Sequence, residues 1–102
     1  MKSINQILTL AETKGRQPVR TFGIHNKDRR QQLYVIGQTG TGKSTLLLQM
    51  MLQDIKAKQG FCLIDPHGDV VKEISKSKPD VLIEWNVANP NCPYGYNPLS
   101  YV

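Results

Sequence analysis

The stretch YVIGQTGTGKSTLLLQMM, residues Tyr34–Met51, decides the fold of this 102-residue chain. A short aromatic and β-branched run ending at Gly37 is typical of a strand, which we predict over residues 32–37. A glycine-rich loop follows, and the leucine-rich run after it predicts a helix from Lys43 to about Lys58. Apolar residues cover most of the circumference of this helix, so we expect it to be largely buried.

The loop itself, GQTGTGKS over residues 37–44, fits the phosphate-loop pattern G-x-x-x-x-G-K-[ST]. Its glycines let the backbone curl closely around an anion, and the following helix adds its unpaired N–H groups and positive end. In such a loop Lys43 lies between the β- and γ-phosphates, Ser44 offers a hydroxyl to Mg²⁺, and Thr45 reaches the α-phosphate. The sequence therefore predicts binding of ATP with Mg²⁺. The residues expected to hold the nucleotide are Gly37, Gln38, Thr39, Gly40, Thr41, Gly42, Lys43, Ser44 and Thr45.

Two further apolar runs, FCLID at 61–65 and DVLIEW at 80–85, predict buried strands, with a helix over 69–77 between them. Apolar strands that alternate with helices indicate an α/β fold with a parallel sheet and flanking helices, here of the P-loop NTPase type. Three strands are too few to complete such a sheet. We therefore expect it to be incomplete at the C-terminal side and to need strands after Val102 or other subunits.

Residues 1–30 form a basic N-terminal segment, and we expect the ATPase domain to begin at residue 31. Ser3 is a candidate cap for a short helix through Lys14, and VRTFGI at 19–24 predicts a weak strand. Net charge is +5, and seven of the thirteen Lys and Arg residues lie in these first thirty positions. This asymmetry suits a polyanionic partner such as DNA, although charge alone favours a solvated basic face.

Two cysteines and the hydropathy pattern bear on the cellular setting. Cys62 lies in a predicted buried strand and Cys92 in a proline-rich loop, and the spacing favours neither a metal site nor a structural disulfide. No apolar run approaches the roughly 20 residues that span a bilayer, and the N-terminus lacks the pattern of a secretory signal. We expect a cytoplasmic chain, and a peripheral position at the inner face of the membrane is the alternative.

Asp65 ends the predicted strand 61–65 at the same sheet edge as the phosphate loop, where open α/β sheets bind ligands. A carboxylate there could hold Mg²⁺ through water or orient an attacking water, and Asp65 is our second candidate catalytic residue beside Lys43. The alternative is that Asp65 only caps the turn at Pro66. His67 suits a ligand contact or turn packing, and Asp69 suits a helix N-cap better than a ligand role.

Three strings, YVIGQTGTGKSTLL, LIDPHGD and YGYNPL, together resemble the HerA/FtsK-type P-loop ATPases. The resemblance is nearest to the branch of conjugative DNA-transfer and type IV secretion ATPases, with their HerA-like helicase relatives, and it covers residues 20–100. Many families share the phosphate loop, whereas the Asp-Pro-His-Gly-Asp and Gly-Tyr-Asn-Pro-Leu strings are the discriminating parts.

The resemblance implies a RecA-like ASCE topology and a ring-forming, typically hexameric ATPase that moves DNA, and sometimes protein, at membrane-associated secretion machinery. It also implies a later strand with a metal-binding Asp and a catalytic Glu, and the 102 residues contain no such segment. Glu84 lacks the preceding aspartate and is a poor substitute. Trp85 stands where the family often has acidic residues, and it suits packing under the loop better than base stacking.

Three functions remain open from the sequence. The first is the ATP-binding portion of a DNA-translocating ATPase, with ATP–Mg²⁺ binding and weak or no hydrolysis by this chain alone. The second is a small P-loop phosphotransferase, which needs an arginine-bearing lid and an acceptor pocket that the sequence does not show. The third is a non-enzymatic nucleotide-binding or DNA-associating fragment that uses the basic N-terminal segment.

Overall fold

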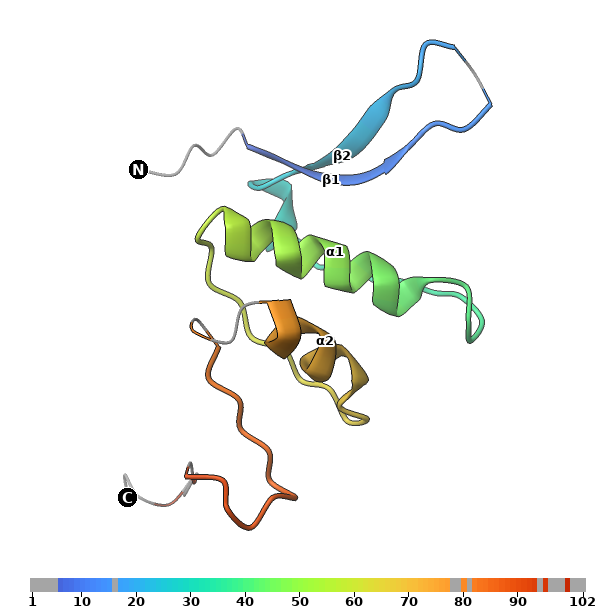
Figure 1. The fold of residues 1–102 in the computed structure, drawn as a ribbon. Coiled ribbons are helices and arrows are strands. Elements are labelled where there is room, and N and C mark those ends of the chain that lie inside the picture. Colours follow the sequence, from blue (N-terminus) through green and yellow to red (C-terminus); the bar gives the residue numbers. More distant parts are fainter. Residues whose placement is uncertain are drawn as a thin grey trace.

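The computed structural model describes residues 6–15, 17–77, 80, 82–93, 95 and 99. In chain order the elements are strands β1 (Ile7–Glu12) and β2 (Thr21–His25), a 3-10 helix η1 (Asp28–Arg30), and helices α1 (Lys43–Lys56) and α2 (Asp69–Ser77). Figure 1 shows the β1–β2 hairpin, α1 and α2 in successive layers, with the last described segment running away from α2. Within the described residues, α1 packs against both β1 and α2.

The N-terminal part of the chain is a β-hairpin, and the helix predicted from Ser3 to Lys14 is wrong over its described residues. β1 pairs with β2 in antiparallel register, with Leu8 opposite Ile24 and Glu12 opposite Thr21. Ser3 and Ile4 lie outside the described residues. The apolar spacing in this segment fits a helix locally, but pairing with β2 satisfies its backbone groups and buries Leu8 instead. The weak strand predicted at 19–24 is confirmed as β2.

Gly23 allows the two strands to approach closely near a β-bulge between Thr9 and Ala11. A Cβ added at Gly23 would lie 2.0 Å from the carbonyl oxygen of Leu8, well inside contact distance. A bulge places two residues of one strand opposite one of the other, and a glycine provides the room that this crowding needs.

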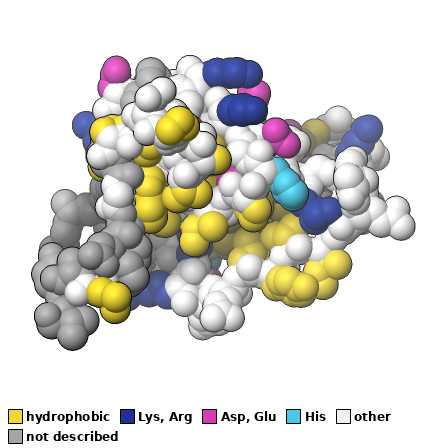
Figure 2. Space-filling model, turned by 90° about the horizontal axis from the view of Figure 1, so that it is seen from below, with side chains coloured by type: hydrophobic (Ala, Val, Ile, Leu, Met, Phe, Trp, Pro, Cys, Tyr) yellow, Lys and Arg dark blue, Asp and Glu magenta, His cyan; other side chains and the backbone are white. Residues whose placement is uncertain are grey.

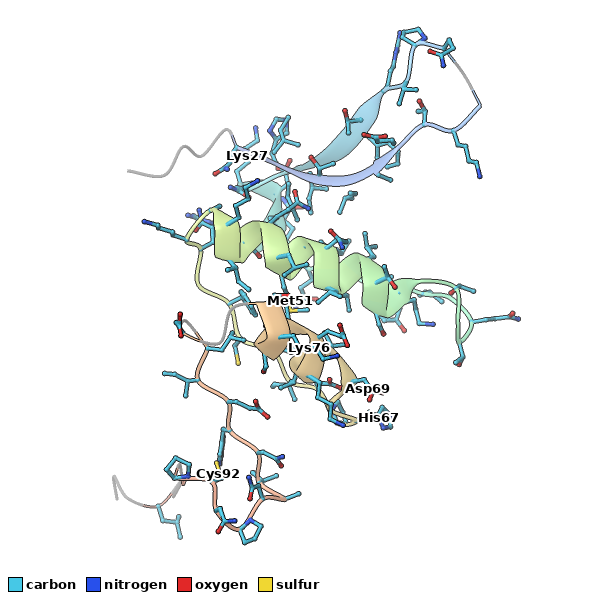
Figure 3. All side chains as sticks on the ribbon, viewed as in Figure 1. Lys27, Met51, His67, Asp69, Lys76 and Cys92 are labelled. Atoms are coloured by element: carbon cyan, nitrogen blue, oxygen red, sulfur yellow. The ribbon has the colours of Figure 1, made fainter. Side chains whose placement is uncertain are left out.

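Helix α1 confirms the helix predicted from Lys43, and it ends at Lys56, two residues before the predicted end. Its burial differs from the expectation, because only Met50 and Asp54 are fully buried while Leu47 is 40% exposed. Figure 3 shows Met51 on the side of α1 toward α2. The sides of α1 that face β1 and α2 are covered, and other apolar positions of the helix are partly exposed to solvent.

Two polar contacts join the C-terminal half of α1 to the hairpin and to η1. The side-chain amide of Gln53 accepts from the Thr9 N–H at 3.0 Å and donates to the Thr9 carbonyl at 2.8 Å. It therefore bonds to the edge of β1 as a neighbouring strand would. Arg29 of η1 donates two hydrogen bonds to the Asp54 carboxylate, at 2.7 and 2.6 Å, and Asp54 is only 4% exposed. We call these two contacts the hairpin clamps.

Helix α2 confirms the helix predicted over 69–77, and its Ile74, at 2% exposure, is the most deeply buried side chain described. None of the helices in the described residues is long and apolar enough to cross a membrane.

The three strands predicted at 32–37, 61–65 and 80–85 are not paired into a sheet where the structure describes them. Their large apolar side chains are exposed instead, with Tyr34 at 86%, Ile64 at 87% and Ile83 at 80%. Cys62 is also exposed, which corrects the expectation that it lies in a buried strand. Figure 2 shows apolar side chains at the surface over much of one face.

The dimensions of the chain agree with this exposure. Its radius of gyration is 16.8 Å, whereas a compact domain of this length has about 13 Å. A strand that has no neighbours cannot bury its side chains or pair its backbone, so these segments have the exposure expected of strands without partners. The parallel P-loop sheet stays a prediction.

Candidate functional site

The phosphate loop is a turn that leads directly into α1 (Figure 1). Gly40 and Gly42 have φ angles of 81° and 98°, in the left-handed region that favours glycine. The Thr41 hydroxyl donates to the Gln38 carbonyl at 2.6 Å and closes the turn. A Cβ at Gly37 would lie 2.6 Å from that hydroxyl oxygen, so glycine is needed there for close packing of the loop on itself.

Lys43 is the first residue of α1, and its side chain folds back over the loop. Its ammonium group donates to the carbonyl oxygen of Gly37 and, at 2.8 Å, to that of Gln38. These bonds place the positive charge inside the loop rather than in open solvent. An ammonium group in this position is available to a phosphate that enters the loop, if the phosphate oxygens replace the two carbonyl oxygens.

Ser44 and Thr45 lie in the first turn of α1 and are both exposed. The N-cap residue is Gly42, which has no side chain to accept hydrogen bonds from the first N–H groups of the helix. The start of α1 therefore combines an uncapped, positive helix end with the Lys43 ammonium group. All nine predicted nucleotide-binding residues, Gly37 to Thr45, lie together in this turn and helix start.

Asp65 is the main acceptor in the turn before α2. Its carboxylate accepts hydrogen bonds from the N–H groups of Val70 at 2.9 Å, Val71 at 3.3 Å and His67 at 3.2 Å. Burial acts to raise the pKa of Asp65. The hydrogen bonds that its carboxylate accepts from backbone N–H groups of the turn and of the start of α2 outweigh this effect, so the pKa of Asp65 is lowered from its ordinary value. The carboxylate thus caps the turn and the start of α2, while a catalytic or metal role stays a prediction.

Asp69 does not supply the cap that the sequence predicts for it. It is the first residue of α2, and the carboxylate that accepts the N–H groups of that helix belongs to Asp65, four residues earlier. An aspartate before Pro-His-Gly reaches the same N–H groups from outside the helix, because the turn at Gly68, with φ of 80°, brings it back over the helix start. Figure 3 shows His67 and Asp69 together at this end of α2.

The phosphate loop and the Asp65 turn lie at the same end of the two packed helices, since the N-termini of α1 and α2 both point to the right in Figure 1. The uncapped N-terminus of α1 provides partial positive charge there, whereas the Asp65 carboxylate caps the N-terminus of α2. No group of three or more His, Cys, Asp or Glu side chains within the described ranges could hold a metal ion.

The region after α2 contributes other contacts. Glu84 accepts a hydrogen bond from the Ser75 hydroxyl at 3.2 Å, which ties the chain back to α2. Trp85 is 49% exposed and has interactions of its own. Both predictions for Trp85 remain untested.

The main features missed by the sequence interpretation are the hairpin and its clamps. A small cavity of about 40 Å³ lies between β1 and the end of α1, lined in part by Leu8, Asn26 and Gln53, away from the phosphate loop. Two apolar runs separated by Gly15 and Pro18 are the signal that could have indicated a hairpin.

Comparison of the sequence with models of known protein families shows to which family the chain belongs. A family described as the type IV secretion-system coupling protein DNA-binding domain matches residues 18–90, well over half of the chain. The chain belongs to this family. The match begins in the hairpin connection and covers the phosphate loop, both helices and the segment after α2. It supports the secretion and conjugation branch of the resemblance drawn from the sequence. Comparisons with curated proteins and with solved structures give no match.

Proposed function

We propose that this chain binds ATP with Mg²⁺ through residues 37–45 and forms part of an ATPase that moves DNA for type IV secretion or conjugation. The observation that carries the proposal is the loop geometry: two left-handed glycines and an uncapped helix start surround the Lys43 ammonium group. Family membership supports DNA as the partner. Ring assembly, most simply a homo-hexamer, and contact with membrane-associated secretion machinery belong to the same proposal.

In this proposal each residue of the loop has a separate task. The backbone N–H groups around Gly40 and Gly42 bind phosphate oxygens, and Lys43 exchanges its two carbonyl partners for the β- and γ-phosphates. Ser44 is exposed at the helix start, where its hydroxyl is a suitable hard oxygen ligand. Mg²⁺ commonly takes one or two protein oxygens together with phosphates and waters, so one hydroxyl fits the ion.

Hydrolysis needs groups beyond the phosphate loop. Asp65 already accepts backbone N–H groups at the start of α2, which reduces its capacity to bind an ion or orient water. We therefore expect the chain alone to bind ATP with Mg²⁺ and to hydrolyse it weakly or not at all. Phosphate release measured with and without DNA separates a motor unit from a non-catalytic nucleotide-binding fragment, because only the motor unit responds to DNA.

Isothermal titration calorimetry with ATP and Mg²⁺ tests the nucleotide site. Lys43→Ala removes the loop charge and is expected to weaken binding by at least about tenfold, since charged hydrogen bonds contribute about 1.5–3 kcal/mol. Lys56→Ala, at the far end of α1, removes the same charge from an exposed position and should bind as the parent does. Equal affinity of the parent and Lys43→Ala would refute the assignment of the loop.

A further inference from the structure

The connection between β1 and β2 is a basic, exposed tip. Residues 13–20 contain three Lys and Arg residues and no Asp or Glu. Lys14 and Arg20 are both exposed. The ion pairs found in the described residues, Arg29–Asp54 and Lys76–Glu73, involve neither of them. The tip therefore presents positive side chains to solvent, next to the exposed Glu12 at the end of β1.

The hairpin is fixed at its base and closed near its tip. Both hairpin clamps act at the base, through Thr9 on β1 and Arg29 after β2. Beyond β1 and β2 the pairing continues, because the Thr13 N–H donates to the Arg20 carbonyl at 2.8 Å and the Arg20 N–H donates to the Thr13 hydroxyl at 2.9 Å. Figure 1 shows the tip projecting away from α1. Thr13 and Arg20 are thus held by pairing, and Lys14 and Arg20 stay exposed to solvent.

Arg20 has an aromatic neighbour on the same face of the hairpin. Arg20 directly precedes β2 and continues its pairing with Thr13, and residues two apart on an extended strand point to the same face, so we expect its side chain on the face of Phe22. Phe22 is 54% exposed, so part of its ring is accessible to a ligand. A cation beside an exposed aromatic ring is the combination that binds a phosphate and stacks a base of single-stranded nucleic acid.

We propose that the hairpin tip is a DNA-contact site in which Lys14 and Arg20 bind backbone phosphates and Phe22 stacks on an unpaired base. This inference rests on the proposed function, because the family supplies DNA as the partner. It goes beyond that function by assigning the contact to three residues outside the phosphate loop. The aromatic ring favours a single DNA strand over a duplex, in which stacking leaves no base free to meet it.

Helix α1 connects the hairpin that carries this site with the phosphate loop. Helix α1 starts at Lys43 in the phosphate loop and carries both hairpin clamps near its other end, at Gln53 and Asp54. The DNA contact and the phosphate loop are therefore attached to the two ends of one helix.

Fluorescence anisotropy with a labelled single-stranded oligonucleotide, repeated over a range of salt concentrations, tests the site. Lys14→Gln/Arg20→Gln should weaken binding at low salt and reduce the slope of log affinity against log salt by about 1.4, or 0.7 for each lost phosphate contact. The substitutions leave both Thr13–Arg20 hydrogen bonds in place, because neither bond uses the side chain of Lys14 or Arg20. Lys56→Gln/Lys72→Gln removes the same charge from two exposed helix positions and should keep the slope of the parent.

Phe22→Leu tests the stacking part of the proposal. It should weaken binding of the single strand roughly fivefold or more and leave binding of a duplex of the same length nearly unchanged. Equal losses of DNA affinity in the Lys14/Arg20 and Lys56/Lys72 variants would overturn the site. Binding to anionic vesicles is measured as well, and a Lys14/Arg20 variant that loses affinity for vesicles but not for DNA would also overturn it. ATP binding, measured in parallel, distinguishes failure of this site from failure of the nucleotide site, since none of these residues lies in the phosphate loop.

Discussion

At the scale of single residues, the charged side chains of the phosphate loop and the Asp65 turn form hydrogen bonds within the chain itself. Lys43 bonds to two loop carbonyls, and Asp65 bonds to the N–H groups that open α2. In the first arrangement the ammonium group of Lys43 can exchange its carbonyl partners for the oxygens of a phosphate. The second uses an acidic side chain for local structure, which explains why an aspartate in this position need not be catalytic.

Replacement of Asp65 by alanine should destabilise the chain in a pH-dependent way. The pKa of Asp65 is lowered in the folded chain, so its stabilising effect is present above the ordinary pKa of about 3.9 and is lost as pH falls through the folded-state pKa. Thermal denaturation of the parent and Asp65→Ala should therefore show a clear difference at pH 7 that narrows below pH ~4. A difference that stays constant down to pH 2 would contradict the hydrogen-bonding role of the carboxylate.

At the scale of elements, α1 and α2 followed from the sequence and the hairpin did not. Helical spacing and flanking glycines are local signals, and the predicted helices at 43–58 and 69–77 agree with the structure to within two residues. The predicted N-terminal helix failed because β1 depends on pairing with β2. The clamps were equally out of reach, since they join residues 44 and 25 positions apart.

Loss of the ion pair in the hairpin clamps should have a large effect. Arg29→Ala leaves the Asp54 carboxylate buried without its partner, which typically costs about 3–5 kcal/mol for a fully buried pair and somewhat less here, because Arg29 is 26% exposed. Urea denaturation measures the change. The exposed pair Lys76–Glu73 is the control, and Lys76→Ala should cost at most about 0.5 kcal/mol. Similar losses for the two variants would show that the Arg29–Asp54 pair does not anchor the hairpin.

The close approach at Gly23 gives a second prediction for the hairpin. Gly23→Ala forces its methyl group against the Leu8 carbonyl and should cost about 1–3 kcal/mol through displacement of the strands. Gly60→Ala places a methyl group in open space and is expected to be nearly neutral in the same denaturation experiment. If Gly23→Ala also proves neutral, the strands are not held at the observed separation.

At the scale of the whole molecule, the apolar segments at 32–37 and 61–65 remain exposed, and the chain is larger than a compact domain of its length. The parallel sheet that these segments are expected to form with partners stays a prediction. Hydrogen exchange should therefore be fast in the backbone amides of 61–65 and slower in the centre of α1, around Met50. Comparable protection in both regions would mean that the segment 61–65 is already paired with a neighbour in solution.

The central claim is that residues 37–45 hold the phosphates of ATP. Amide chemical shifts of the chain, followed by NMR during titration with ATP and Mg²⁺, test it directly. The account predicts saturable shifts that are largest at the N–H groups of Gly40, Gly42, Lys43 and Ser44, with little change in the hairpin tip. Saturable shifts centred elsewhere, or no shifts at millimolar ATP, would contradict it.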